Sequence, residues 1–272
     1  MKSAMGFSVA TWNINSVRLR IDLVCRFLRE HAPDVLCLQE TKCPQGQFPG
    51  AKLKAMGYEH IAEFGQKGYH GVAIVSRIPF TGQVSHDFCR KGDCRHVSVV
   101  LDLPDPTVVH NFYIPAGGDE PDPGINDKFA HKLAFLDELQ SWTQSKARPG
   151  GHEAILVGDL NIAPLTEDVW SHKDLLKVVS HTPIETEALL AIQQAGGWQD
   201  VMRKHVPPDQ KLYTWWSYRA KDWQAANRGR RLDHVWASEG IANRSTGITV
   251  HKDARGWQQP SDHVPVIARF SA

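Results

Sequence analysis

Short apolar runs, separated by clusters of polar and turn-forming residues, recur along the whole chain. Some runs alternate apolar and polar positions and others are continuously apolar, which is typical of strands that helices cover on one face or both. The pattern predicts β-strands at Phe7–Ile14, Asp34–Gln39, Gly71–Ser76, His96–Leu103, Thr107–Ile114, Glu153–Leu160, Arg231–Ser238, Gly247–Lys252 and Val264–Phe270.

A helical apolar repeat interrupts the strands and predicts helices at Val17–His31, Asn126–Ser145 and Thr186–Gln194. The apolar face of the first helix consists of Leu19, Leu23, Phe27 and Leu28. That of the second consists of Phe129, Leu133, Leu136, Leu139 and Trp142. Pro33 prevents the first helix from continuing, Asn126 is a suitable N-cap for the second, and the glycines after Ala195 end the third.

Strands occur in both halves of the chain with helices between them, and no low-complexity linker divides it. The most loop-like segment, Pro115–Gly124, lies between a strand and a helix, where long polar loops are more often functional than linking. We therefore expect an α/β protein of two packed sheets with helices outside, forming a single domain over residues 1–272.

Composition adds little to this picture. The chain is 42% hydrophobic and 22% charged with a net charge of +1, so no global basic field indicates nucleic acid, although a neutral protein can carry a basic face. The 5 Cys form no CxxC pair, and the segment before Asn15 has no signal-peptide core. We expect a cytoplasmic protein without a membrane segment, and either Met1 or Met5 could be its first residue.

Polar side chains gather where predicted strands end or begin. The positions are Asn13 and Asn15, Glu40 and Lys42, Asp159 and Asn161, and Asp262 and His263. Residues two apart on a strand point to one face, so Asp159 with Asn161 can converge on one point. Carboxylate and amide oxygens favour Mg²⁺ or Mn²⁺ over zinc. Each residue taken alone fits a cap or turn equally well, and the set is meaningful only if the fold gathers it.

Several segments resemble, in the same order, those of the exonuclease III family of abasic-site endonucleases, within the endonuclease/exonuclease/phosphatase superfamily. They read TWNINSVRLR, LCLQETK, GVAIVSR, FYIPAGG, LVGDLNIAP, RGRRLDHVWAS and SDHVPV. The resemblance implies a DNase I-like, four-layered α/β sandwich of two mixed sheets flanked by helices. It also implies metal-dependent hydrolysis of DNA phosphodiesters: incision 5′ to abasic sites in duplex DNA, 3′-to-5′ exonuclease activity and trimming of 3′ ends.

The resemblance also implies roles for individual residues. Glu40 would be the main ligand of Mg²⁺, for which Mn²⁺ could substitute. The further metal-ligand candidates are Asn13, Asp159, Asn161 and Asp262. Asp159 would deprotonate the attacking water or protonate the leaving oxygen, and Asn161 would donate to a phosphate oxygen. One or two metal ions are compatible with this set.

Three more catalytic candidates follow from the same resemblance. His263 would stabilise the phosphate charge, Asp233 would fix the tautomer of His263, and Tyr113 would bond the scissile phosphate. Without the resemblance, Asp233 fits a surface ion pair with Arg231, and Tyr113 fits a core position.

The segment Leu212–His234 combines aromatic residues with Arg and Lys, which can stack on sugars or bases while holding phosphates. A packed aromatic cluster with a solvated basic rim is the alternative. The resemblance makes Trp215 the aromatic residue of an abasic-sugar pocket, and the candidate DNA contacts are Lys42, Arg95, Arg228 and Arg230. Asp119, in the loop after Tyr113, has the wrong sign for a phosphate contact.

We therefore expect a monomeric enzyme that acts on duplex DNA with abasic sites or 3′ ends, without a protein partner. A phosphatase or phosphodiesterase acting on phospholipids or inositol phosphates is the alternative within the same fold. A catalytically inactive DNA-binding relative is a third reading, but it would have lost Glu40, Asp159 or His263, and all are present. The balance among the nuclease activities stays open.

Overall fold

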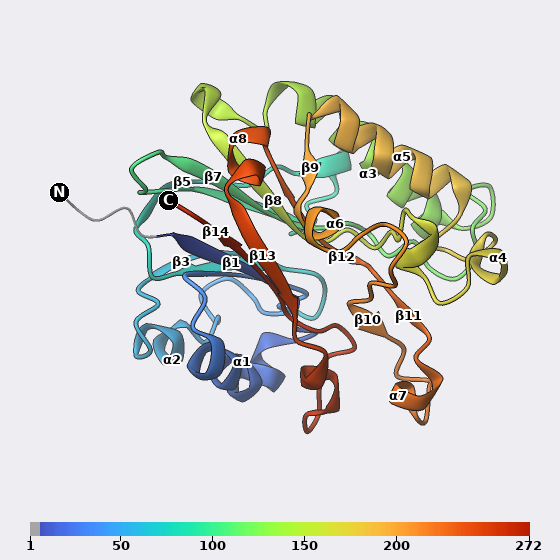
Figure 1. Ribbon diagram of the computed structural model, residues 1–272, viewed down its shortest axis with the longest axis horizontal. Coiled ribbons are helices and arrows are strands. Elements are labelled where there is room, and N and C mark those ends of the chain that lie inside the picture. The colour runs from blue at the N-terminus through green and yellow to red at the C-terminus, as the bar shows by residue number, and fades with distance from the viewer. Residues whose placement is uncertain (1–5) are drawn as a thin grey trace.

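The computed structural model describes residues 6–272, so Met1 and Met5 lie outside the described residues. Two 6-stranded sheets pack face to face, and helices cover the outer face of each (Figure 1). This arrangement confirms the predicted four-layered α/β sandwich with two mixed sheets.

The first sheet is built around one parallel strand pair. Its order is β13 (Ser245–Val250), β14 (Val266–Phe270), β1 (Phe7–Asn13), β2 (Val35–Gln39), β4 (Val72–Ser76) and β3 (His60–Phe64). Strands β1 and β2 are parallel, and all other neighbours in this sheet are antiparallel. Helix α1 (Val17–His31) connects the parallel pair, as a parallel crossover requires.

The second sheet repeats this plan. Its order is β5 (Phe80–Val84), β6 (His96–Leu101), β7 (Thr107–Tyr113), β8 (Glu153–Asp159), β12 (Asp233–Ala237) and β9 (Gln199–Asp200). Only β7 and β8 are parallel, and α3 (Asp127–Ser145) connects them. The carboxyl ends of a parallel pair therefore lie in each sheet at a single edge.

Helices α1 and α2 (Gly50–Lys54) cover the first sheet, whereas α3 and α5 (Pro183–Ala195) cover the second (Figure 1). The short elements are α4 (His172–Leu175), α6 (Val201–His205), α7 (Trp223–Ala226), α8 (Glu239–Asn243) and the ribbon of β10 (Trp215–Trp216) with β11 (Gly229–Arg230). Among the described residues, no helix combines the length and apolarity needed to cross a membrane.

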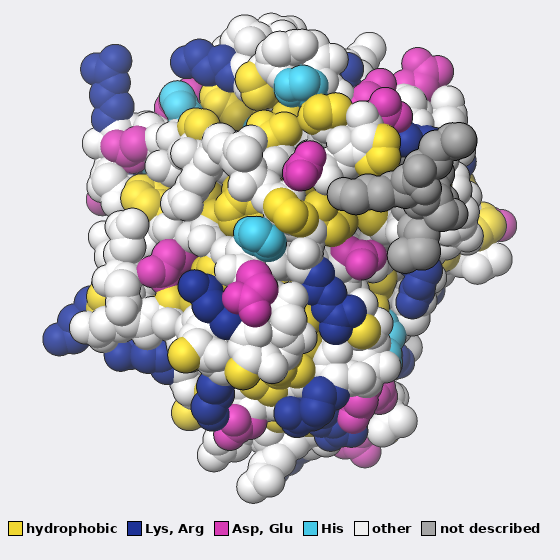
Figure 2. Space-filling model, turned by 90° about the vertical axis from the view of Figure 1, so that its left-hand side faces the viewer, with side chains coloured by type: hydrophobic (Ala, Val, Ile, Leu, Met, Phe, Trp, Pro, Cys, Tyr) yellow, Lys and Arg dark blue, Asp and Glu magenta, His cyan; other side chains and the backbone are white. Residues whose placement is uncertain are grey.

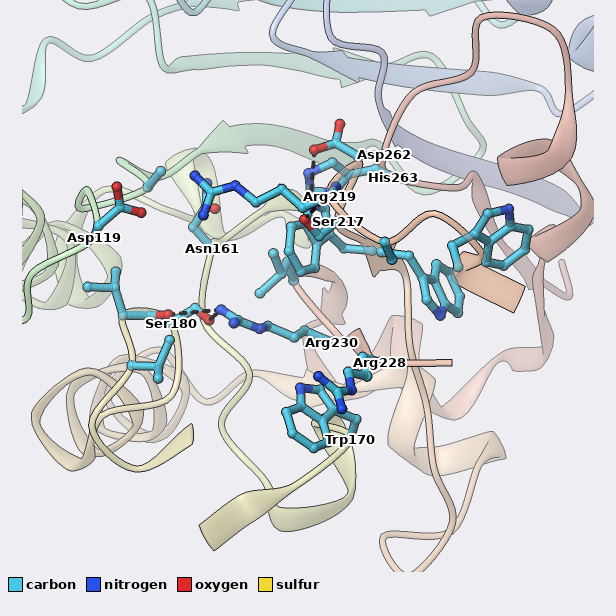
Figure 3. A pocket seen from close by; sticks show the side chains of 18 of the residues that line it. Asp119, Asn161, Trp170, Ser180, Ser217, Arg219, Arg228, Arg230, Asp262 and His263 are labelled. Carbon is cyan, nitrogen blue, oxygen red and sulfur yellow. Dashed lines mark hydrogen bonds between the residues drawn. The ribbon is translucent and has the colours of Figure 1, made fainter. Parts of the chain in front are cut away.

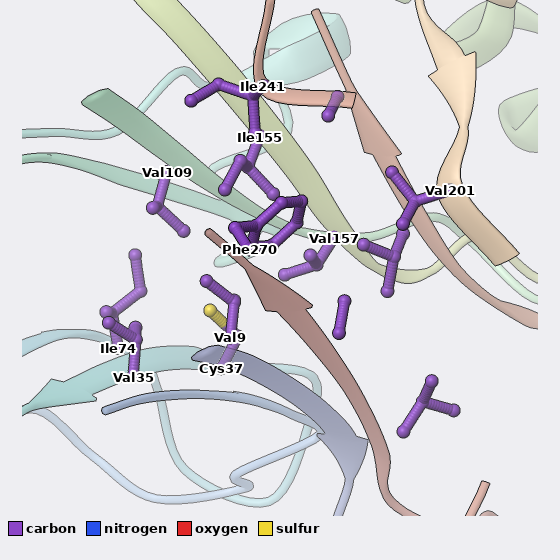
Figure 4. Close-up of a cluster of buried hydrophobic side chains, with 14 of the residues drawn as sticks. Val9, Val35, Cys37, Ile74, Val109, Ile155, Val157, Val201, Ile241 and Phe270 are labelled. Carbon is purple, nitrogen blue, oxygen red and sulfur yellow. The ribbon is translucent and has the colours of Figure 1, made fainter. Parts of the chain in front are cut away.

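The main core lies between the two sheets, where inward-facing side chains such as Val9, Val35, Ile155 and Val157 are fully buried (Figure 4). Burial of this kind is the main favourable contribution to folding. Gly158 allows β8 to lie close to β7, because its φ is 146° and a Cβ there would lie 2.0 Å from the carbonyl oxygen of Phe112. No other residue fits this position without moving the strand.

The predicted elements are present with shifts of one to three residues at their ends. Leu19 was expected on the buried face of α1 but is 61% exposed, because the face that packs on the sheet is made by Val17, Ile21, Val24, Cys25, Phe27 and Leu28. Helix α5 begins three residues earlier than predicted because Thr182 and Glu185 form a capping box. The strands β3 and β5 escaped prediction because each carries several partly exposed polar residues.

Two buried histidines beneath α3 form a hydrogen-bonded chain with fixed directions. The backbone N–H of His86 donates to Nδ1 of His96 (3.1 Å), Nε2 of His96 lies 3.1 Å from Nδ1 of His110, and Nε2 of His110 lies 2.7 Å from the carbonyl of Ala147. Since the first donor is a backbone N–H and the last acceptor a carbonyl, both imidazoles are neutral and each donates from Nε2. Burial lowers the pKa of His110 to about 4, and burial also lowers the pKa of His96 well below its ordinary value.

We predict that acid destabilises the protein through this chain. The unfolded chain binds a proton on each imidazole below its ordinary pKa of 6.5, whereas the folded chain binds one on His110 only below about 4. Stability should therefore fall as the pH drops from 6.5 to 4, by on the order of 3 kcal/mol for His110, and His96 should add a loss of the same sign. Urea unfolding at several pH values measures this loss.

His110→Gln isolates the contribution of one imidazole. The amide of Gln can accept from His96 and donate to Ala147 without titrating, so its unfolding free energy should vary less with pH than that of the wild type. His152, which lies in a loop, provides the control as His152→Gln. Equal pH dependence in wild type and His110→Gln would contradict the prediction.

Candidate active site

The polar residues that the sequence places at strand ends meet at one edge of the sandwich. Asn13, Tyr113 and Asp159 are the last residues of β1, β7 and β8, and Glu40 directly follows β2. Asp233 begins β12, which runs antiparallel to β8 and pairs it with Asp159. The two parallel strand pairs, one from each sheet, therefore supply the site together.

Asn13 links the two sheets at this edge. Its Nδ2 donates to Oε1 of Glu40 (3.0 Å) and to Oδ2 of Asp159 (2.8 Å), while its Oδ1 accepts from the backbone N–H of Asn15 (3.0 Å). Because a backbone N–H can only donate, the amide must turn its nitrogen toward the carboxylates. Ligation of a metal by Asn13 stays a prediction; in this structure its Oδ1 accepts from Asn15 and its amide nitrogen holds the two carboxylates in place.

Glu40 is surrounded by donors. Tyr113 donates its hydroxyl to Oε1 (2.8 Å), and the ammonium of Lys42 lies 2.9 Å from Oε2. Burial alone would raise the pKa of Glu40, but Lys42, Asn13 and Tyr113 hold it below its usual value. Burial and the nearby carboxylates of Glu40 and Asp159 raise the pKa of Tyr113 well above 10, so Tyr113 keeps its proton here.

Asp159 is almost fully enclosed, with 1% of its surface exposed. Its Oδ1 accepts from the backbone N–H of Asn161 (3.0 Å), and its Oδ2 accepts from the side-chain amide of Asn161 (3.1 Å) as well as from Asn13. Burial, together with the charges of Asp233 and Glu40, raises its pKa. A buried carboxylate with a raised pKa is suited to accept and release a proton near neutral pH.

His263 lies between two carboxylates. Its Nδ1 is 2.8 Å from Oδ2 of Asp233, and its Nε2 is 3.6 Å from Oδ2 of Asp159. Burial lowers the pKa of His263, but the charges of Asp233, Asp159 and Asp262 outweigh it and raise the pKa overall. The imidazole is therefore positively charged, and its Nε2–H can be offered to an anion.

Asp262 connects the aromatic segment to the site. Its Oδ2 accepts from Nε1 of Trp215 (2.9 Å), and its Oδ1 accepts from the side chain of Asn15 (3.3 Å). Trp215 also pairs through its backbone with His263. Several of these residues have left-handed backbone, with φ of 47° at Asn15, 48° at Glu40 and 53° at Asn161. Such conformations concentrate at functional sites because surrounding contacts must hold them.

A cavity of about 680 Å³ opens beside these residues (Figure 3). Glu40, Asn161, Asp262 and His263 line it, together with aromatic and basic side chains such as Trp170, Trp215, Arg228 and Arg230 and with small and apolar residues. The guanidinium of Arg228 lies 4.7 Å from the ring centre of Trp170, and that of Arg230 lies 5.2 Å from that of Trp215. Arg230 also donates to Oγ of Ser180 (2.8 Å), as Figure 3 shows. Asp119 lines the same cavity.

Two of the predicted DNA contacts, Lys42 and Arg95, form ion pairs within the protein, and their contact with DNA stays a prediction. Lys42 pairs with Glu40 and also donates to Oδ1 of Asn15 (2.7 Å). Arg95 is 5% exposed, pairs with Asp93 (2.7 Å), and its guanidinium lies 5.0 Å from the ring centre of Tyr113. Arg95 therefore packs against the ring of Tyr113 and helps to fix its position. Arg228 and Arg230 do line the cavity.

The aromatic segment divides between the two interpretations that the sequence left open. Trp215, Trp216 and Trp223 all line the cavity, and Trp216 is also 2% exposed and packs with Tyr213 and Val264, as a packed cluster requires. Sequence reasoning missed Trp170 as a cavity residue, and it did not assign Asn15 a role beyond its spacing from Asn13. Trp170 gave no local signal, because it follows a loop and belongs to no periodic pattern.

The donor set fits a hard divalent cation. Glu40 faces the cavity with its charge retained, and the nearby ammonium of Lys42 shows that this side of the carboxylate accommodates a cation. Asp262 lines the same end. Possible ligand atoms, one each from Asp159, Asp233 and His263, also lie within 4.8 Å of one another. However, His263 already contacts both carboxylates through its two ring nitrogens, so these three residues form an Asp–His–Asp arrangement. One oxygen of Asp233 has no hydrogen-bond partner among the described residues.

The site can therefore bind an anion and move a proton. His263 and the arginine side chains can hold a phosphate, and the carboxylate of Asp159 is held rigidly within reach of His263. Hydrolysis of a phosphate ester needs charge neutralisation, an activated water and stabilisation of the departing oxygen.

Comparisons with known proteins agree with this arrangement. The model of the Endonuclease/Exonuclease/phosphatase family matches residues 10–263. The chain is 29% identical to exodeoxyribonuclease III from Haemophilus influenzae, over 96% of this chain and 98% of that protein. It is similar in structure to an AP endonuclease from Archaeoglobus fulgidus (TM-score 0.90, 31% identity, 98% of this chain and 100% of that one). It is also similar to the 3′ phosphatase NExo from Neisseria bound to a product DNA hairpin (TM-score 0.88, 30% identity, 98% and 100%).

A buried ion network anchors the segment that carries Asp233 and Arg230. Arg231 makes two bonds to Asp168 (2.7 and 2.9 Å) and a third to Asp200 (2.6 Å). Arg203 also donates to Asp168. Arg231 and Asp168 have no solvent-exposed surface. Arg231 therefore does not pair with Asp233, which remains available to His263.

We predict that Asp168→Asn destabilises the protein by about 3–5 kcal/mol, because it leaves buried guanidinium charge without its carboxylate. Denaturant unfolding measures the loss. The neighbouring Glu167 pairs with Lys211 near the surface (2.9 Å), so Glu167→Gln should cost less than about 1 kcal/mol. Similar losses in the two variants would show that the network around Asp168 contributes no special stability.

Proposed function

The chain belongs to the endonuclease/exonuclease/phosphatase family and is a DNA-repair nuclease, and we propose that it cuts duplex DNA 5′ to abasic sites. We also propose 3′-to-5′ exonuclease activity and trimming of 3′ ends. One observation carries the proposal: a single cavity is lined both by Glu40, Asp262 and His263 and by Trp215 with its arginine neighbours. Catalytic groups and polymer-binding groups thus face the same space.

The family is metal-dependent, and we propose Mg²⁺ as the metal, with Mn²⁺ able to replace it. Glu40 would be the main ligand, with Asp262 and Asp159 as further oxygen donors. Asn13 would act by holding Glu40 and Asp159, and ligation by Asn161 stays a prediction. When bound, the cation would neutralise phosphate charge and lower the pKa of a water molecule.

The side chains around the cavity would have distinct roles in the reaction. The charged imidazole of His263 would donate from Nε2 to a phosphate oxygen, and Asp233 would keep it charged and oriented. Asp159 would accept the proton of the attacking water as the new O–P bond forms. The bond from phosphorus to the departing oxygen then breaks, and that oxygen takes up a proton. Tyr113 would stay protonated and donate to Glu40 or to the phosphate.

The DNA would lie along the arginine and tryptophan side of the cavity. Trp215 would contact the sugar that lacks a base, and Arg228 and Arg230 would contact phosphates. Extruding such a nucleotide costs little because it makes no stacking contact. On the opposite face of the molecule, basic and acidic side chains are interspersed, so no uniformly basic surface competes there (Figure 2). We propose that the enzyme acts as a monomer in the cytoplasm.

We predict that the purified protein cuts a duplex containing one abasic analogue when Mg²⁺ is present and stops cutting when a chelator is added. Gel electrophoresis of the end-labelled strand measures incision, and an intact duplex in parallel measures exonuclease activity. An inositol polyphosphate, assayed for phosphate release, should remain unchanged. Absence of DNA cleavage in Mg²⁺ would falsify the proposed function.

We also predict that Glu40→Gln raises the Mg²⁺ concentration required for half-maximal cleavage by at least about tenfold, because it weakens the main ligand. A titration of initial rate against Mg²⁺ measures the shift, and high Mg²⁺ should restore part of the activity. Glu239→Gln, which removes an exposed carboxylate on α8, is the matched control. An unchanged Mg²⁺ requirement in Glu40→Gln would exclude Glu40 as the main ligand.

A further inference from the structure

Lys132 is a fully buried lysine on α3, on the side of the catalytic loops that faces away from the cavity. Its ammonium group lies 2.5 Å from Oε1 of Glu185 on α5, and neither side chain has exposed surface. Lys132 lies on the buried face of α3, between Phe129 and Leu136, and was not singled out from the sequence. Lysine and glutamate are almost never fully buried without a specific partner.

The ammonium also holds two loops of the active site. It donates to the carbonyl of Asn161 (2.8 Å) and to the carbonyl of Ala116 (3.2 Å), so all three of its donors are used. Asn161 in turn holds both oxygens of Asp159, by its backbone N–H and its side-chain amide. Asn161 has a left-handed backbone, so the direction of its carbonyl is set by this contact.

Glu185 extends the arrangement to the wall of the cavity. Its carboxylate accepts from the backbone N–H of Ser180 (3.0 Å to each oxygen) and from the backbone and hydroxyl of Thr182 (3.3 and 2.5 Å). Ser180 also has a left-handed backbone, with φ of 88°, and its hydroxyl accepts from Arg230. One ion pair thus contacts the turn that carries Asp159 and the loop that orients Arg230.

Apolar side chains could hold α3 against α5 as well as the charged pair of Lys132 and Glu185 does. A buried ion pair contributes little to stability compared with apolar residues of similar size, because both charges lose their hydration. What apolar side chains cannot replace is the set of hydrogen bonds to Asn161, Ala116, Ser180 and Thr182. The pair therefore supplies orientation to the loops, beyond any attachment of the helices.

We propose that Lys132 and Glu185 are positioning residues, which fix the catalytic turn at Asn161 and the cavity wall at Ser180 for the reaction. Neither touches the cavity, and each acts through the loop that it holds. The inference rests on the proposed function for its kinetic test, but its structural test does not need enzyme activity.

The decisive variant is the apolar pair Lys132→Met with Glu185→Leu. Lys132→Met alone should lower both the melting temperature and kcat, because it leaves Glu185 buried without its partner. The double variant should recover part of the melting temperature, because no charge is left buried without a partner, but it should not recover kcat, which should stay about 10- to 100-fold below the wild type because the turn is misplaced. The KM for the abasic duplex should change by less than about threefold, since the surface that binds most of the polymer is intact. Recovery of kcat together with the melting temperature would show that the pair only joins the helices, and would overturn the proposal.

Amide hydrogen exchange tests the same inference without any substrate. In the double variant the backbone amides of Asn161 and Ser180 should lose protection, whereas those in the middle of α3 and α5 should keep it. Unchanged exchange at both loop amides would overturn the proposal even if the wild type proved inactive on DNA. Because the double variant replaces two buried groups, Glu185→Gln provides a milder second test that retains an acceptor for Ser180, and it should lower kcat less.

Lys204→Met is the matched control. Lys204 also donates to a backbone carbonyl, that of Ala242 (2.6 Å), but it lies on α6 and is exposed. Its kcat and the exchange at Asn161 should equal those of the wild type. A comparable loss of kcat in Lys204→Met would show that removal of any such lysine has this effect, and would overturn the specific role of Lys132.

Discussion

A single amide holds two carboxylates that belong to different sheets. The Nδ2 group of Asn13 donates to Glu40, at the end of a strand in the first sheet, and to Asp159, at the end of a strand in the second. Two carboxylates that share one amide donor repel each other, and burial increases the free-energy cost of keeping both ionised. The remaining contacts of the site, from Lys42 and Tyr113 to Asn161 and His263, supply the donors and positive charge that allow the two to remain together.

The topology explains why such an amide is available at this point. Each sheet contains one parallel pair whose crossover helix lies on its outer face, so both pairs end at the same edge. Strands that run the opposite way begin there and bring Asp233 and His263 to the same place. A buried layer of apolar side chains sets the distance between the sheets, and Gly158 permits the close approach of β7 and β8 beneath the site.

Much of this could be predicted from sequence because strand ends and side-chain alternation are local properties. Asn13, Glu40, Tyr113, Asp159 and His263 all lie where their strand ends placed them. What the chain does not encode locally is the partner of each charge. Arg231 is next but one to Asp233 in sequence but pairs with Asp168 and Asp200, and Leu19 looks buried until the sheet selects another face of its helix. Lys132 was not singled out from the sequence, and only the fold reveals the carbonyls it contacts.

Because the two carboxylates come from different sheets, the active site depends on the assembly of the whole domain. Since Glu40 and Asp159 come from different sheets, no fragment that contains only one sheet holds a complete site, and loss of contact between the sheets separates the pair. A proteolytic fragment or a partly unfolded molecule with only one sheet in place would therefore lack one of the two carboxylates. Competence to cut is a property of the fully assembled molecule, which makes folding itself a safeguard against stray cleavage.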